Sequence, residues 1–296
     1  MTGPTPSCKL LWKEKDLLRA RRHWRASIRD ERGWRSVRPA SGPYARAALV
    51  EWGSITKGPV GTAATMVLPL DREVRQFAPR FPGADFTVQD LIEHTAGLPR
   101  LHVGMGLVPF RDPYLPTVGA TLDPDSVVRS GDRGQFAYSN LGYALLGELL
   151  DDVDGNWFRT VRKLVLEPAG ITTATTAPLE TARVVPRRLG RPVEPWRMGG
   201  SPYAAAGGIW STFEDLCRYA DWTLGDLDDP ARTVAWQRRE ATVWINGQVR
   251  AAGAAIVSAG GVTAVVHALA QRLFTPDRIA SAVIERELAG RGERLR

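Results

Sequence analysis

The chain has 296 residues, of which 44% are apolar and 24% charged, which is typical of a soluble globular protein with one large domain or two interleaved lobes. No apolar run reaches the roughly 18 residues of a membrane span, and no signal peptide opens the chain, so we predict a cytoplasmic protein. Cys8 and Cys217 are expected to be unpaired thiols, and four scattered histidines lack metal-ligand spacing, so we expect neither a metal nor another cofactor.

The net charge of +7 is concentrated at the start of the chain. Residues 1–50 hold 12 Lys and Arg against 4 Asp and Glu, whereas the remainder holds 27 against 28. Residues 9–32 are predicted to form a charged helix, and residues 1–44 a basic, Arg-rich leader. One interpretation of this basic leader, with its interleaved tryptophans, is that it contacts nucleic acid or an anionic surface. A solvated helix is the favoured one, so no nucleic acid partner is expected.

A short apolar segment at residues 45–52, predicted to be a strand, leads into Gly53-Ser54-Ile55-Thr56-Lys57. A helix that opens at Ser54 places its hydroxyl and the Lys57 amine about one turn apart on one face. In a partly buried pocket an unprotonated Lys57 takes the proton of Ser54, which turns a weak alcohol nucleophile into an attacking alkoxide. A lone Ser-x-x-Lys pattern is common on solvated helices, so this prediction depends on the residues downstream.

The middle of the chain is predicted to be mainly helical. A short buried helix after Lys57 ends at Pro69, and Thr87 with Asp90 has the pattern of a capping box. His94 follows that second helix and is expected to hold backbone in place at a helix end, in preference to acting as a base. Two further helices are predicted at 141–151 and 157–166, between loops at 100–130 and 178–200.

The C-terminal part changes from helical to strand periodicity. Ser211 or Thr212 is expected to cap a helix that runs to Leu224. Short β-rich runs separated by glycines then predict an antiparallel meander at 242–245, 254–257 and 262–269. Residues 276–288 predict a closing amphipathic helix.

Five motifs stand in an order and spacing that resemble the serine β-lactamase and penicillin-binding-protein superfamily: Ser54-x-x-Lys57, His94-Thr95-Ala96-Gly97-Leu98, Tyr138-x-Asn140, Gly207-Gly208-x-x-Ser211-Thr212 and Asn246-Gly247. The chain looks most similar to class C β-lactamases, D,D-carboxypeptidases and their esterase relatives. The resemblance implies an α+β fold over residues 45–296, with an antiparallel β-sheet flanked by helices. A mainly helical lobe at about 60–200 is inserted into a sheet lobe formed by 45–57 and about 201–296.

The resemblance also implies roles for particular residues. Ser54 would attack a carbonyl carbon, Lys57 would accept its proton, and Tyr138 would shuttle protons to and from the leaving group. A tyrosine has a high ordinary pKa, so this role requires Lys57 to lower the pKa of Tyr138. Asn140 is expected to hold the substrate amide or Lys57.

The remaining predicted site residues belong to the last motif, Asn246-Gly247. The backbone N–H groups of Ser54 and Gln248 are expected to form an oxyanion hole, with Asn246 and Gly247 as further substrate-binding positions. The family normally opens this motif with Lys or His, but here the aligned residue is Ile245. The missing cation places β-lactamase and peptidase activities in doubt, unless Arg250 replaces its charge.

Two other departures concern the fold. The segment between Lys57 and Thr87 is several residues short of the family pattern. Residues 1–40 do not show the pattern of the opening β-hairpin, so the N-terminal strands are expected to be missing or replaced by a divergent element.

The function predicted from these residues is a serine hydrolase that cleaves a small-molecule ester or amide through an acyl-serine intermediate, esterase-like in preference to a true β-lactamase. Two alternatives stay open. One is a biosynthetic acyltransferase that uses the same site, and the other is a degenerate protein that binds a ligand without catalysis.

Overall fold

The computed structural model describes residues 23–102, 104–106, 111–270 and 274–292. Its centre is a six-stranded sheet in the order β2-β1-β10-β9-β8-β7, in which every neighbouring pair is antiparallel. The strands are β1 (Trp24–Asp30), β2 (Gly33–Arg38), β7 (Gln237–Arg239), β8 (Thr242–Val249), β9 (Ala252–Ala259) and β10 (Val262–Ala268). The predicted C-terminal meander is thus confirmed as β8, β9 and β10.

The N-terminal strands overturn one sequence prediction. Residues 24–30 form β1, which pairs with β10, and β2 pairs with β1, so the helix expected at 9–32 is wrong from residue 24 onward. The opening hairpin is present, and residues 24–38 belong to the sheet and not to a separate leader. Residues 1–22 lie outside the described part. Ala26 and Ile28 alternate inward between arginines, a period of two that the high charge concealed.

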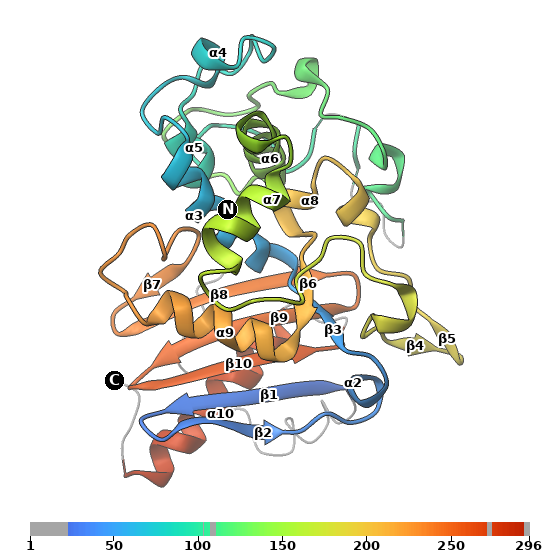
Figure 1. Cartoon of the computed structure of the whole chain (residues 1–296), viewed down its shortest axis with the longest axis vertical. Helices are drawn as coiled ribbons and strands as arrows, with labels where there is room; N and C mark the ends of the chain where they lie inside the picture. The colour runs from blue at the N-terminus through green and yellow to red at the C-terminus, as the bar shows by residue number, and fades with distance from the viewer. Residues whose placement is uncertain (1–22, 103, 107–110, 271–273, 293–296) are drawn as a thin grey trace.

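The two faces of the sheet are covered by different helices. Helix α10 (Thr275–Gly290), which was predicted, packs on one face with Ile279, Ile284 and Leu288 against β9 and β10. Helix α9 (Phe213–Leu224) contacts β10 from the other face (Figure 1). Thr212 caps α9, as expected, because its side chain accepts the N–H of Asp215.

The helical region stands beyond one edge of this arrangement (Figure 1). Helix α6 (Asn140–Asp154) is its buried centre, with Ser139 as N-cap and Gly155 in the left-handed region. Around it lie α3 (Lys57–Val67), α4 (Val74–Phe77), α5 (Val88–Ile92), α7 (Trp157–Val161) and the π-helix η4 (Arg162–Leu166). The predicted helices and the Thr87–Asp90 capping box are confirmed here.

Short elements connect the two regions. Strand β3 (Leu49–Glu51) pairs antiparallel with β6 (Trp210–Thr212), and β3 leads directly into the 3₁₀ turn η1 (Gly53–Thr56). The other short elements are α2 (Pro43–Arg46), α8 (Ala204–Gly207), β4 (Arg187–Arg188), β5 (Arg191–Pro192), η2 (Leu115–Thr117), η3 (Pro124–Ser126), η5 (Glu180–Ala182) and η6 (Arg197–Gly200).

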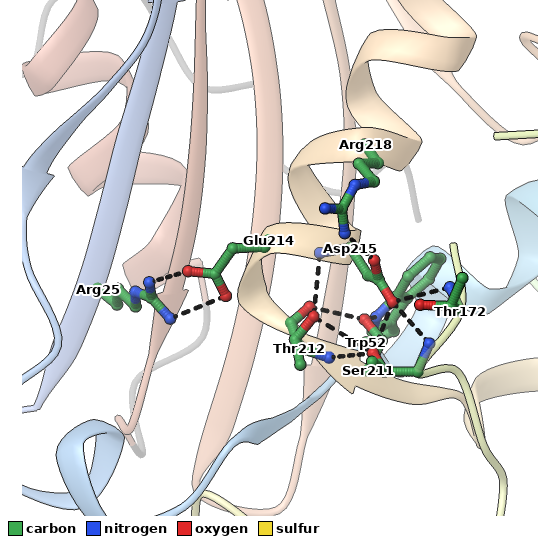
Figure 2. A network of polar contacts seen from close by, with 9 residues as sticks. Arg25, Trp52, Thr172, Ser211, Thr212, Glu214, Asp215 and Arg218 are labelled. Carbon is green, nitrogen blue, oxygen red and sulfur yellow. Dashed lines mark hydrogen bonds and ion pairs between the residues drawn. The ribbon is translucent and has the colours of Figure 1, made fainter. Parts of the chain in front are cut away.

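A polar network fixes the junction between β6 and α9 (Figure 2). Buried Asp215 accepts the N–H groups of Thr172 and Thr173 at 3.2 and 2.8 Å and pairs with Arg218. The Trp52 indole N–H donates to Ser211 Oγ at 2.8 Å. These bonds anchor the backbone two residues before the predicted nucleophile.

In the described ranges, no helix combines the length and apolar character that a bilayer crossing requires.

Candidate active site

Ser54 lies in a tight turn at the end of β3. The preceding Gly53 has φ +53°, which other residues rarely adopt, and a Cβ there would stand 3.2 Å from the backbone nitrogen of Gln248. The Trp52 N–H donates to the Ile209 carbonyl at 3.0 Å, which ties the turn to the strand before α9. The turn therefore presents a half-buried Ser54 hydroxyl against β8.

Four of the predicted site residues are brought together around this hydroxyl. Ser54 Oγ lies 2.6 Å from Tyr138 Oη and 3.3 Å from Lys57 Nζ. Lys57 Nζ also donates to Asn140 Oδ1 at 2.9 Å and to the Ala206 carbonyl at 2.5 Å. These three contacts hold the amine at the nucleophile.

The electrostatics of this cluster follow from its burial. Burial lowers the pKa of Lys57, and the nearby positive charge of Arg100 lowers it further, while Tyr138 acts in the opposite direction. Burial alone would raise the pKa of Tyr138, but the charge and hydrogen bonding of Lys57, together with Ser54 and Arg100, bring it below its ordinary value. Lys57 and Tyr138 are therefore a coupled pair suited to sharing one proton.

Asn140, at the start of α6, and His94, which follows α5, support the pair. Asn140 Nδ2 donates to Tyr114 Oη at 3.1 Å, which fixes the amide with its oxygen toward Lys57. His94 Nδ1 accepts the N–H of Ser139 at 3.2 Å, the backbone-holding role expected from the sequence. Burial and the charge of Lys57 lower the pKa of His94 to about 3, so its ring is neutral at physiological pH.

The Asn246-Gly247 motif is only partly as predicted. Gly247 lies directly behind the nucleophile, where a Cβ would stand 2.0 Å from the Trp52 carbonyl and 2.6 Å from Ser54 N. The Asn246 side chain faces the other side of β8, where its Nδ2 donates to Asp277 Oδ1 at 2.5 Å, so it is not among the residues that the structure brings together around Ser54. Side chains alternate along a strand, and the position that faces the helices beside Gly247 is Ile245, buried in the core.

Gln248 follows Gly247 in β8 and lies at the pocket. It lines the cavity beside Ser54, while its side-chain amide donates to the Ala252 carbonyl at 2.7 Å. Its backbone nitrogen faces the Gly53 turn, the position that the predicted oxyanion hole requires. Arg250, in the turn between β8 and β9, is not among the described residues that line the cavity.

The pocket has a wall that the sequence did not reveal. Its lining residues are Gly53, Ser54, Arg100, Tyr114, Asn140, Trp196, Met198, Gly207, Gln248 and Val249. Arg100, Tyr114, Trp196 and Met198 come from segments predicted as loops, where no periodicity indicates direction. The one signal in the sequence is that Arg100 directly follows Gly97-Leu98-Pro99, a glycine and proline segment expected to end the preceding helix.

The chain matches a family model and several solved structures over most of its length. The family model described as Beta-lactamase matches residues 19–272. A class C beta lactamase from Rhodobacter sphaeroides superposes with a TM-score of 0.69 at 17% identity, covering 91% of this chain and 95% of that one. A D-amino acid amidase from Ochrobactrum anthropi SV3, complexed with D-phenylalanine, gives 0.69 at 16% identity, covering 92% and 96%.

Two further similarities are more limited. SurE with D-Leu gives a TM-score of 0.62 at 19% identity, covering 92% of this chain and 72% of that one. A putative fimbrial assembly protein, FimD serogroup D of Dichelobacter nodosus, is 31% identical over 144 residues, which are 44% of this chain and 36% of that protein. The chain thus spans about a third of the length of the curated relatives it matches. At their low identities the solved structures establish the fold alone.

Proposed function

The chain belongs to the beta-lactamase family, and from that premise we propose that it is a serine hydrolase that cleaves an ester or amide through an acyl-Ser54 intermediate. The observation that carries this proposal is the contact of one hydroxyl with two proton carriers. Ser54 Oγ lies within hydrogen-bond distance of both Tyr138 Oη and Lys57 Nζ. This is the arrangement that nucleophilic catalysis by an alcohol needs.

Acylation begins with proton transfer from Ser54 to the Lys57–Tyr138 pair. The Ser54 oxygen then forms a bond to the substrate carbonyl carbon, and the negative charge that develops on the carbonyl oxygen is stabilised by the backbone N–H groups of Ser54 and Gln248. As the bond to the leaving group breaks, Tyr138 delivers the proton to the departing oxygen or nitrogen.

Deacylation repeats these steps with water. A water molecule gives its proton to the same pair while its oxygen attacks the acyl carbon, and Ser54 recovers a proton as it leaves. The amide of Asn140 holds Lys57 throughout, because its Oδ1 accepts from Nζ and its Nδ2 is anchored to Tyr114.

The type of substrate bond that the protein cleaves is inferred from the residues of β8. Since Ile245 is buried where the family has a cation, β8 offers no positive charge to a β-lactam carboxylate. This favours an ester, or an amide that needs no cation on β8, over a β-lactam. Two structural neighbours have D-amino acids bound, which makes amides of D-amino acids reasonable first amide substrates to assay.

The test is labelling of the nucleophile. The wild-type protein should react with an uncharged fluorophosphonate probe at Ser54, identified by peptide mass spectrometry, and should hydrolyse p-nitrophenyl acetate. Ser54→Ala should lose both, whereas Ser130→Ala, at an exposed loop serine, should keep both. Absence of labelling at Ser54 in the folded wild type would refute catalysis and leave a ligand-binding protein. Added amine acceptors that yield amide product would instead indicate acyl transfer.

A further inference from the structure

The backbone of Arg100 is fixed at the entrance to α6. Its carbonyl accepts the N–H groups of Asn140 and Leu141 at 3.0 and 3.2 Å. Gly97, three residues earlier, has φ +71° and its carbonyl accepts the N–H of Ser130 at 2.9 Å. Arg100 therefore projects from a held turn, so its side chain has a defined starting point beside the site.

The Arg100 side chain lines the pocket next to Tyr138. Its guanidinium carbon lies 5.5 Å from the centre of the Tyr138 ring, and Ser54 lines the same cavity. The residue is exposed, and it forms no ion pair with any carboxylate in the described part of the chain. Among the described lining residues it alone carries a formal charge. An unpaired guanidinium at a pocket is available to a ligand.

On the opposite side of the pocket, the described lining residues supply no comparable group. Ile245 is buried in the core, and the side-chain amide of Gln248 is engaged with the Ala252 carbonyl. The positive charge of the pocket therefore stands on the Tyr138 side of Ser54 and not on the β8 side.

We propose that Arg100 binds a carboxylate carried by the leaving group of the substrate, an inference that rests on the proposed function. In that reaction Tyr138 delivers a proton to the departing atom, so the leaving group lies beside Tyr138 and within reach of the guanidinium. The planar fork of Arg matches the two oxygens of a carboxylate. The substrate class is then an ester or amide whose alcohol or amine portion is itself an acid.

Three phenyl esters test the position of the charge: phenyl acetate is neutral, 3-acetoxybenzoate has a carboxylate on its leaving group, and monophenyl succinate has one on its acyl group. We expect Arg100→Gln to lower kcat/KM for the leaving-group acid, 3-acetoxybenzoate, by about 10- to 100-fold relative to phenyl acetate, the range for a hydrogen bond between charged groups. Arg100→Lys should retain part of that ratio. Arg197→Gln, at an exposed arginine flanked by two lining residues, should leave it unchanged.

Other results would overturn the proposal. An equal loss for all three esters, with the pH profile moved to higher pH, would make Arg100 a positioning residue that acts through Tyr138. A selective loss for monophenyl succinate would place the carboxylate on the acyl portion.

A binding measurement separates this inference from the proposed function. In a Ser54→Ala background, calorimetry should show 3-hydroxybenzoate, the carboxylate leaving group itself, binding about tenfold or more weakly once Arg100→Gln is added. Equal affinities would refute the role of Arg100 even if Ser54 is labelled. Weakened binding without Ser54 labelling would instead refute the proposed chemistry alone.

Discussion

Two walls enclose the candidate nucleophile, and they differ in the chemistry they offer. The helical wall, formed by Lys57, Tyr138, Asn140 and Arg100, supplies an amine, a phenol, an amide and a guanidinium around Ser54. The sheet wall is the part of β8 from Ile245 to Gln248, which turns an apolar side chain, a glycine and backbone groups toward the helices. Under the proposed function, proton transfer belongs to the helical wall, whereas the sheet wall sets the shape of the pocket and its backbone contacts.

The largest effect should come from the phenol of the helical wall. Tyr138→Phe removes the hydroxyl 2.6 Å from Ser54 Oγ, and we expect kcat/KM for p-nitrophenyl acetate to fall about 10²- to 10⁴-fold, the usual contribution of a general acid–base. Tyr143→Phe is the matched control, because that hydroxyl donates to the Ile92 carbonyl and not to Ser54. Comparable losses in both variants would contradict the assigned division of roles.

The next effect concerns the shape of the sheet wall. Gly247→Ala places a Cβ 2.6 Å from Ser54 N, so the turn and β8 must separate, and we expect an activity loss of up to about 100-fold with about 1–3 kcal/mol of destabilisation. Gly290→Ala, at the open end of α10, should change neither quantity in esterase assays and thermal unfolding. Full activity in Gly247→Ala would show that the close contact is unimportant.

The pH profile tests the shared proton of the helical wall. Because the pKa values of Lys57 and Tyr138 are lowered, the acidic limb of kcat/KM should lie below the ordinary range of either residue, with activity rising about tenfold per pH unit along it. His102→Gln, at a half-buried histidine hydrogen-bonded to Tyr203, should leave the midpoint in place. A midpoint at or above about pH 10 would exclude the coupled pair as the proton acceptor.

The smallest effect on activity should come from the face of β8 that carries Asn246 and lies on the side of α10. Asn246→Ala removes the hydrogen bond to Asp277 and should leave kcat/KM within about twofold, while costing about 1–3 kcal/mol of stability because a half-buried carboxyl loses its donor. Asn140→Ala, the same substitution on the helical wall, should lower activity strongly because Lys57 loses its acceptor. If the two variants lost activity equally, Asn246 would have to reach the substrate.

The sequence predicted the helical wall far better than the sheet wall. Ser54 and Lys57 are separated by one helical turn, so their proximity follows from local geometry alone. Tyr138 and Asn140 are distant in sequence and were identified by resemblance. On the strand, a motif of three adjacent residues was assigned to one site although alternation turns Asn246 away from it.

Two other features were missed for physical reasons. The arginines of β1 gave it the composition of a solvated helix, while its short inward alternation of Ala26 and Ile28 is completed only by pairing with β10. Arg100 and Tyr114 sit in irregular segments whose direction is set by tertiary hydrogen bonds and not by any repeat.

The pairing of β1 with β10 has a consequence for the order in which the protein is made. β1 can pair with β2 early, but Arg29 lies opposite Thr263, 234 residues later, so almost the whole polypeptide must leave the ribosome before the other edge of β1 is paired. Closing so long a loop is slow, and until then a nascent strand with unsatisfied backbone groups is open to wrong partners. Arg25 and Arg29, within β1, are charged side chains of the kind that oppose pairing with a wrong edge.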